Sequence, residues 1–339
     1  MTQRDLVVVG ASAGGLEALR EIVAGFPADL RATVLIVLHL PASATSYLPT
    51  ILGKASKLRV VQAVHGAPLE PGTIHVAPPD HHLLVHGNAL RLSRGPKVNG
   101  HRPAVDALFL SAARWMGPRT IAVVLSGSLD DGTAGARHVL RAGGVTIAQD
   151  PLDALYPSMP RSAIEAGGIQ LVQPVARIVE AIVSATGEEV MAAPPESGSQ
   201  KEDRPDRFDD VDAMLAFEPV GDATPVASAS GFTCPDCHGA LWEVTEDQLV
   251  RYRCRIGHSF APKSLFNAQS EKIEEAMWAG YRALAESAAL ALRLATRAEE
   301  QGLPAIAARW RTKYDEAMER ATTLQSVLEG GQLATEESP

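Results

Sequence analysis

The sequence predicts an α/β protein: a doubly wound, mostly parallel sheet flanked by helices, followed by a small zinc-ribbon-like module and an α-helical hairpin. Three observations predict this architecture. Between residues 1 and 186, short apolar runs alternate with helical patterns, an order typical of parallel sheets that are covered on both faces. All three cysteines fall between residues 232 and 260. From about residue 263 the sequence is rich in Ala, with apolar residues at helical spacing.

The elements of the sheet domain follow from apolar runs bounded by turn-forming residues. Leu6–Val9 and Thr33–Leu38 are continuous apolar runs, as expected for strands buried on both sides. The other expected strands are Arg59–Val64, Thr73–Val76, Leu83–Val85, Ile121–Leu125, Val145–Ala148 and Ile169–Val172. The expected helices are Leu16–Phe26, Ala104–Met116, Thr133–Ala142, Arg161–Ala166 and Val175–Thr186.

Composition divides the 339 residues into five segments. Residues 1–186 form the α/β domain, and residues 187–230, rich in Pro, Ser, Gly, Asp and Glu, form a flexible linker. The remaining segments are a zinc-binding module at 231–262, a helical hairpin at 263–330 and a disordered tail at 331–339. Residues 302–304, Gly-Leu-Pro, separate the two antiparallel helices of the hairpin. These helices either pack only on each other, self-associate or bind a partner helix.

Charge and hydropathy exclude several classes of protein. A formal net charge of −9 argues against nucleic-acid binding, which needs a basic surface. No apolar run is long enough to span a bilayer, and the N-terminus has no signal-peptide pattern. Three cysteines do not make a disulfide framework in a chain of this size. We therefore expect a cytoplasmic protein.

Cys234, Cys237, Cys254 and His258 have the spacing of a structural zinc site. A C-x-x-C pair and a C-x-x-x-H pair flank a β-like stretch and supply three thiolates and one imidazole. His238 is the alternative fourth ligand, and His258 is preferred because it completes the second pair. A redox C-x-x-C is the competing interpretation, but no βαβ pattern surrounds it. Four protein ligands close the site, so the expected Zn²⁺ stabilises the fold, and no cofactor is expected for catalysis.

Ser12 lies where the first strand ends and the first helix begins. Residues 10–14, Gly-Ala-Ser-Ala-Gly, fit the G-x-S-x-G spacing of a nucleophile elbow. The helix N-terminus presents unpaired N–H groups at this point, and the small neighbours allow a substrate to approach. The competing interpretation is a Gly-rich turn that binds the phosphates of a nucleotide. It is weakened because Ser12 stands at the second glycine of the dinucleotide fingerprint.

His39 and Asp131 are the expected partners of Ser12. His39 ends the second buried strand, and Asp131 follows a later strand and a small-residue loop. The carboxyl ends of parallel strands meet at one edge of a sheet, where a base can reach a serine and an aspartate can orient the base. His39 could instead be satisfied by loop backbone, and Asp131 could simply cap a helix. His81 and His82 are rival bases in a segment that looks like a turn.

Ordered motifs along the first 185 or so residues resemble the catalytic domain of the CheB family, the chemotaxis protein-glutamate methylesterases. The motifs are Val9–Gly15 (VGASAGG), Leu38–Pro41 (LHLP), Pro68–Pro78 (PLEPGTIHVAP), Gly100–Asp106 (GHRPAVD), Leu125–Gly135 (LSGSLDDGTAG), Gly143–Asp150 (GGVTIAQD) and Met159–Ile164 (MPRSAI). The resemblance implies that Ser12 is the nucleophile, His39 the base and Asp131 the orienting carboxylate.

The resemblance also implies an oxyanion hole made of the backbone amides of Ala13 and Ser128. The chain departs from the family at both places. Ala13 stands where the family often has Thr, and Ser126–Leu129 (SGSL) stands where it often has Thr-Gly-Met-Gly. A backbone amide survives such a substitution. Leu129 in place of Gly is expected to alter the backbone of this loop, because Leu disfavours a positive φ.

The implied reaction is hydrolysis of glutamate γ-methyl esters on chemotaxis-type receptor helices, with release of methanol. Deamidation of receptor glutamines would follow by the same acyl chemistry. Family members typically carry an N-terminal receiver domain, which this chain is expected to lack because the catalytic domain starts near residue 5. We therefore expect the zinc module and the helical hairpin to take over targeting or regulation.

Three alternatives stay open at this point: a catalytically silent signalling scaffold, an esterase with another ester substrate, and a nucleotide-binding α/β domain. A Ser12 that does not react with serine-directed probes would favour the scaffold. Thermal stabilisation by nucleotides would favour the nucleotide-binding domain.

Overall fold

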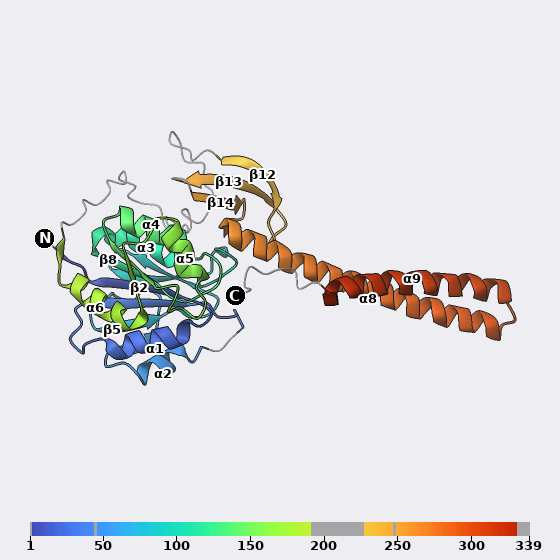
Figure 1. Ribbon diagram of the computed structural model, residues 1–339, viewed down its shortest axis with the longest axis horizontal. Coiled ribbons are helices and arrows are strands. Elements are labelled where there is room, and N and C mark those ends of the chain that lie inside the picture. The colour runs from blue at the N-terminus through green and yellow to red at the C-terminus, as the bar shows by residue number, and fades with distance from the viewer. Residues whose placement is uncertain (1, 44–45, 191–226, 247–248, 331–339) are drawn as a thin grey trace. The chain divides into compact units, whose positions relative to one another are not determined.

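The computed structural model describes residues 2–43, 46–190, 227–246 and 249–330. It divides into two units, Met1–Leu265 and Phe266–Pro339. The centre of the first unit is a seven-stranded sheet in which every neighbouring pair of strands is parallel (Figure 1). In spatial order its strands are β10 (Leu171–Gln173), β9 (Val145–Gln149), β8 (Thr120–Val124), β2 (Leu6–Ala11), β3 (Thr33–Leu38), β5 (Thr73–Val76) and β4 (Arg59–Gln62).

Helices cover both faces of this sheet, as predicted (Figure 1). Alternate side chains of β2 point to opposite faces: Val7 and Val9 pack in one apolar cluster, and Leu6 and Val8 in the other. The first cluster is covered by α1 (Gly15–Gly25), α2 (Leu48–Gly53) and α6 (Val175–Thr186). The second is covered by α3 (Val105–Met116), α4 (Thr133–Arg141) and α5 (Ser158–Glu165).

The chain adds strands on one side of β2 first, beginning with β3, and later on the other side, beginning with β8. β2 is therefore the point at which the order of the strands reverses. Both neighbours are in register with β2 up to its carboxyl end, where Ala11 pairs with Leu38 and Gly10 pairs with Val124. In open α/β sheets, such a switch point leaves a crevice outside the carboxyl ends of the strands. The loops that follow β2, β3 and β8 therefore meet at one place on the sheet edge, as the sequence predicted.

One predicted strand lies outside the main sheet. Residues 83–85 belong to β6 (His82–His86), which forms an antiparallel hairpin with β7 (Ala89–Ser93). The turn between them is Gly87-Asn88, with Gly87 at φ 58°, and turns of this kind match the twist of paired strands. The sequence analysis did not predict β7 or α2, both of which are short. Two further short elements are the 3₁₀-helix η1 (Gly117–Arg119) and the pair β1 (Thr2–Gln3) with β11 (Glu189–Val190).

The zinc-ribbon-like module is an antiparallel four-stranded sheet. Its strands are β12 (Ala227–Thr233), β13 (Ala240–Glu246), β14 (Leu249–Cys254) and β15 (Ser259–Phe260). The sequence placed its start at residue 231, whereas β12 begins at Ala227. The module belongs to the same unit as the large sheet, and the amide of Asn99 donates to the carbonyl of Ser259 at 2.7 Å. Most of the predicted linker and the predicted tail lie outside the described residues.

The helical hairpin is confirmed, with α8 (Pro262–Glu300) and α9 (Pro304–Gly330) joined by a turn at Gly302, whose φ is 70°. Within the second unit the two helices run side by side (Figure 1). Arg311 and Glu299 form an ion pair across the turn, with a nitrogen–oxygen distance of 2.8 Å. The helices also lie close together far from the turn. A Cβ added to Gly280 on α8 would lie 3.4 Å from a methyl group of Leu324 on α9. No helix among the described residues is both long and apolar enough to cross a membrane.

Candidate active site

Ser12 lies in a tight turn between β2 and α1. Gly14, the residue that caps α1, has a φ of 66°, a left-handed conformation that favours glycine. The amide of Ser12 donates to the carbonyl of Ser126 at 3.0 Å, and the hydroxyl of Ser126 donates to the carbonyl of Ala13 at 2.8 Å. These bonds tie the turn after β2 to the loop after β8 and fix the Ser12 backbone at the sheet edge.

His39, at the end of β3, lies between Ser12 and Asp131. Its Nδ1 is 3.1 Å from Ser12 Oγ, and its Nε2 is 2.8 Å from Asp131 Oδ2. An ionised carboxylate only accepts hydrogen bonds, so the Nε2 atom carries the proton toward Asp131. The Nδ1 atom of the neutral ring is then the acceptor for the Ser12 hydroxyl. The three residues chosen from the sequence thus form one hydrogen-bonded row.

The Asp131 carboxylate accepts hydrogen bonds on both of its oxygens. Burial by itself raises the pKa of Asp131, but the hydrogen bond from His39 and the charge of that ring when protonated outweigh burial and hold the pKa well below its usual range. Its Oδ2 also accepts from the Val105 amide at 2.7 Å. Its Oδ1 accepts from Asn99 Nδ2 and from the amides of Asp106 and Gly132, at 2.9, 3.0 and 3.0 Å.

His101 is a residue of the site that the sequence analysis did not select. Its ring stacks on the ring of His39, with centroids 3.7 Å apart and an angle of 16° between the planes. Burial, followed by the neighbouring His39, lowers the pKa of His101 to about 3, so the ring is neutral at neutral pH. The stack fixes the plane of the His39 ring. The signal for it was the Gly100–Asp106 motif before α3, which marked the segment without indicating a contact with His39.

The two rival bases do not contact Ser12 among the interactions of the described residues. His81 has its Nδ1 3.0 Å from the carbonyl of Pro79. His82 is fully buried in β6, where its Nε2 lies 3.0 Å from the carbonyl of Pro96. The sequence placed both histidines in a solvated turn, which is wrong for His82 because the strand begins at that residue.

The amides of Ala13 and Ser128 lie in the two loops that flank Ser12. Among the described residues, neither amide donates a hydrogen bond to another group of the protein. Leu129, the next residue, has a φ of 64°, so the loop adopts a left-handed conformation there despite the absence of glycine. The altered backbone that the sequence suggested at Leu129 is therefore not what the structure shows. Both amides fit the requirement that oxyanion donors have no partner in the protein.

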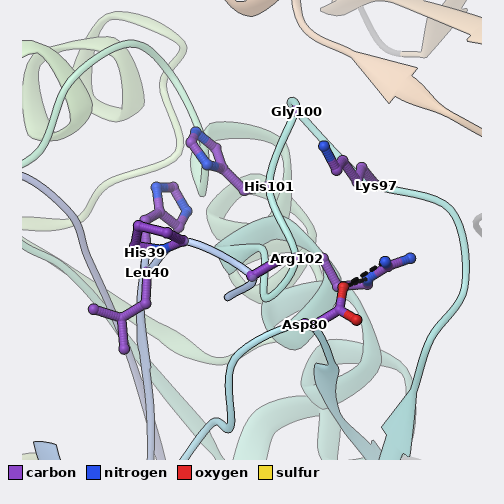
Figure 2. Close-up of a pocket in the computed structure, with 9 residues that line it drawn as sticks. His39, Leu40, Asp80, Lys97, Gly100, His101 and Arg102 are labelled. Carbon is purple, nitrogen blue, oxygen red and sulfur yellow. Dashed lines mark hydrogen bonds and ion pairs between the residues drawn. The ribbon is translucent and has the colours of Figure 1, made fainter. Parts of the chain in front are cut away.

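A cavity of about 360 Å³ opens beside His39 and His101 (Figure 2). Lys97 and Arg102 lie across the cavity from His39 (Figure 2). The Arg102 guanidinium is held by Asp80, with its Nε 2.9 Å from Asp80 Oδ1, and it donates from Nη1 to the carbonyl of Gly95 at 2.7 Å. A substrate that enters this cavity can approach His39 from a side that carries Lys97 and the Asp80–Arg102 ion pair.

Cys234, Cys237, Cys254 and His258 converge, with one ligand atom of each within 4.8 Å of the others. The sulfurs of Cys237 and Cys254 are 3.6 Å apart, and His258 Nδ1 lies 3.5 Å from the Cys254 sulfur and 3.7 Å from that of Cys234. A tetrahedral zinc with Zn–S bonds of ~2.3 Å has ligand–ligand edges of about 3.8 Å, so these residues fit a bound metal. His238, the alternative ligand, is not part of the cluster.

Comparison with known proteins agrees with this geometry. The family model described as CheB methylesterase matches residues 7–182. A protein-glutamate methylesterase/protein-glutamine glutaminase of Pyrococcus horikoshii is 38% identical over 186 residues, which cover 54% of this chain and 50% of the relative. One from Anaeromyxobacter dehalogenans is 41% identical over 183 residues, covering 53% and 52%. The chain thus spans about half the length of the curated relatives it matches.

The fold has a counterpart among solved structures. The crystal structure of the Thermotoga maritima CheB methylesterase catalytic domain superposes with a TM-score of 0.52 and 35% sequence identity. The match covers 54% of this chain and 99% of that structure. The similarity therefore corresponds to the sheet domain, and the module and the hairpin lie outside it.

Proposed function

This chain belongs to the CheB methylesterase family, and on that basis we propose that it is a serine hydrolase that removes γ-methyl esters from glutamate residues of chemotaxis-type receptors. The observation that carries the proposal is the hydrogen-bonded row Ser12–His39–Asp131 at the switch point of the sheet. The name shared by the relatives extends the proposal to deamidation of receptor glutamines.

In the proposed mechanism, Ser12 Oγ attacks the ester carbonyl while His39 Nδ1 takes the hydroxyl proton. Asp131 holds the His39 ring in place and stabilises the imidazolium that forms. The amides of Ala13 and Ser128 donate to the oxyanion of the tetrahedral intermediate. His39 then gives its proton to the methoxide as the C–O bond breaks, which releases methanol and leaves an acyl group on Ser12.

Water completes the cycle by attacking the acyl carbonyl, with its proton passing to His39. Collapse of the second tetrahedral intermediate breaks the bond to Ser12 Oγ, and the proton returns to that oxygen. The products are a free glutamate carboxyl group and the original enzyme. With a glutamine substrate, the same steps release ammonia in place of methanol.

The test is methanol release from a methylated receptor fragment. Ser12→Ala is expected to abolish release, and Asp131→Asn to lower kcat on the order of 10³–10⁴-fold, because the ring of His39 loses its orientation. His39→Ala is expected to be inactive, whereas His81→Ala, the matched control at a rival base, keeps the wild-type rate. If the wild type releases no methanol from a fragment that another family member demethylates, the proposal is wrong, and a silent scaffold or a different ester substrate takes its place.

The metal cluster supports a second, structural part of the proposal. We propose that Cys234, Cys237, Cys254 and His258 bind Zn²⁺, which stabilises the fold of the module and takes no part in the hydrolysis. The three cysteines form no disulfide, which is typical of a reducing compartment and agrees with a cytoplasmic location.

The expected partners are receptor helices at the active site. We further propose that the α8–α9 hairpin is an interaction element, either between copies of this chain or with a partner helix. Large apolar side chains on it are exposed to solvent, among them Trp278 and Leu290 on α8 and Ile306 on α9.

A further inference from the structure

Asn99 connects the cysteine-containing module to the catalytic aspartate. It is buried, with only 3% of its surface exposed, and lies in the loop that precedes α3. Its side-chain Nδ2 donates to Asp131 Oδ1 at 2.9 Å and to Asp106 Oδ2 at 3.0 Å. Its Oδ1 accepts from the amide of Ala261 at 2.9 Å, and its own amide donates to the carbonyl of Ser259 at 2.7 Å.

These contacts leave the Asn99 side chain one orientation. Two carboxylate oxygens face its nitrogen, and a backbone N–H faces its oxygen, so a flipped amide would lose three hydrogen bonds. The backbone of residues 259–261 therefore determines where the donor to Asp131 lies. That segment directly follows the metal ligand His258, whose carbonyl accepts from the amide of Cys254 at 3.0 Å.

Arg251 forms a second connection from the module. It comes from β14 and is 3% exposed, and its Nη2 lies 3.6 Å from Asp106 Oδ2. Neither its Nε nor its Nη2 has a hydrogen-bond partner among the described residues, so Asp106 is its main compensating charge. Asp106 also accepts from the amide of Gly135 at 2.7 Å and shares the Asn99 amide with Asp131. Removing Arg251 would leave two carboxylates around one amide without a nearby cation.

We infer that Asn99 is a positioning residue for the reaction and that the metal-binding module orients Asp131 through it, so that an intact module is needed for a fully reactive Ser12. His39 binds one oxygen of Asp131 and Asn99 binds the other. The inference rests on the proposed function in one respect, that Ser12, His39 and Asp131 act as a hydrolytic triad. It does not depend on which ester is the substrate.

The test uses the full chain in two states, loaded with Zn²⁺ and stripped by a chelator. Two readouts report on the triad without a receptor substrate: the rate at which a fluorophosphonate probe modifies Ser12, and the low-field proton NMR signal of the His39 Nε2–H donated to Asp131. Asn99→Ala is expected to slow modification about 100-fold, as a displacement of about 1 Å in a catalytic group does, and to shift or broaden the proton signal. Removal of the metal from the wild type is expected to have the same effects.

The decisive comparison is between the two changes. If the module acts through Asn99, removing the metal from Asn99→Ala adds little to the loss, because the connection is already broken. Losses that simply multiply, or a metal-free wild type that reacts as fast as the loaded one, overturn the inference.

Arg251→Met tests the same inference independently if Asn99→Ala does not fold. It is expected to slow modification of Ser12, whereas Arg255→Met, which removes the same charge from an exposed site of the module, is not. Equal rates for the two variants overturn the inference. A wild type that releases methanol and is modified at Ser12, alongside variants that match it, disproves only this inference. A wild type that shows neither activity disproves the proposed function as well.

Discussion

Leu129 carries local backbone strain next to a proposed oxyanion donor. Its φ of 64° lies in the left-handed region, which costs a residue with a Cβ about 1–2 kcal/mol. Its carbonyl accepts from the hydroxyl of Ser162 at 3.2 Å, which helps to hold the loop in this conformation. Ser128 precedes it directly, so the strain lies one residue from the amide proposed to bind the oxyanion. Strain of this kind is found at active sites when the surrounding structure enforces it.

The strain predicts an unusual order of stability for two small replacements. Leu129→Ala and Leu129→Gly both delete the side chain beyond Cβ, so they lose the same packing. At an ordinary position Gly is the less stable of the two, but at a positive φ we expect Gly to be more stable by about 1 kcal/mol. Urea unfolding of the two variants measures the difference. An Ala variant that is equally stable or more stable would contradict the left-handed conformation.

The sequence predicted Ser12, His39 and Asp131 because each follows a strand of a parallel sheet, and strand ends meet at one edge. It could not predict His101 or Asn99. Both lie in an irregular loop before α3, where no periodicity relates a residue to the sheet edge. Their contacts with His39 and Asp131 depend on how this loop folds over the strand ends, which is a property of the tertiary structure.

At the scale of elements, the contact between β2 and α3 positions the site. A Cβ added to Gly10 would lie 2.1 Å from Val105 Cγ1, so the strand and the first turn of the helix touch closely. The amide of Val105 is one of the donors to Asp131. A change in the spacing between β2 and α3 is therefore transmitted to the carboxylate that holds His39.

Gly10→Ala should consequently reduce both stability and catalysis. We expect a loss of about 1–3 kcal/mol in the free energy of unfolding, as in other overpacked cores, together with a lower rate of Ser12 modification. Val105→Ala removes the two atoms nearest to the added methyl group. The double variant should therefore lose less free energy of unfolding than the sum of the losses of the two single variants. Thermal or urea unfolding of the single and double variants tests this. Purely additive losses would show that the two residues do not meet.

The β6–β7 hairpin shows which features of a strand its sequence does not determine. The apolar run at residues 83–85 looks like a strand of the main sheet because burial, not pairing, determines its hydropathy. Its partner β7 mixes buried and partly buried residues within five positions, too short and irregular for a clear period. Burial of a strand against another layer can thus be predicted from sequence, whereas the sheet to which it belongs cannot.

For the molecule as a whole, composition separated the module from the sheet domain, yet the structure places both in one unit. Their boundary is polar and buried, and it includes Asn99, Asp106 and Asp130 from the sheet domain. Asp130 is bound by Ser264, whose hydroxyl donates to its Oδ1. No hydrophobic pattern marks such a boundary, which explains why composition suggested independent parts. Buried carboxylates also make its stability depend on pH.

Asp130 gives that dependence a definite sign. Burial raises the pKa of Asp130 to about 6, although the hydrogen bond from Ser264 opposes the rise. Because the folded pKa lies above the value of about 3.9 in the unfolded chain, the folded state holds the proton more tightly. The stability from this group is complete below about pH 4 and is lost as the pH rises through about 6. Asp130→Asn cannot ionise. Its advantage over the wild type should therefore grow by roughly 2–2.5 kcal/mol between pH 4 and pH 8.

Urea unfolding of both proteins across this pH range measures that advantage, with the exposed Asp29→Asn as the control for the loss of one charge. The control is expected to follow the wild type at every pH, because its carboxylate stays in water in both states. Parallel curves for the wild type and Asp130→Asn would mean that folding leaves the pKa of Asp130 unchanged, so that this carboxyl group is ionised in the folded protein at neutral pH. In that case the hydrogen bonds from the Ser264 hydroxyl and the Lys263 backbone would compensate the buried charge as well as water does in the unfolded chain.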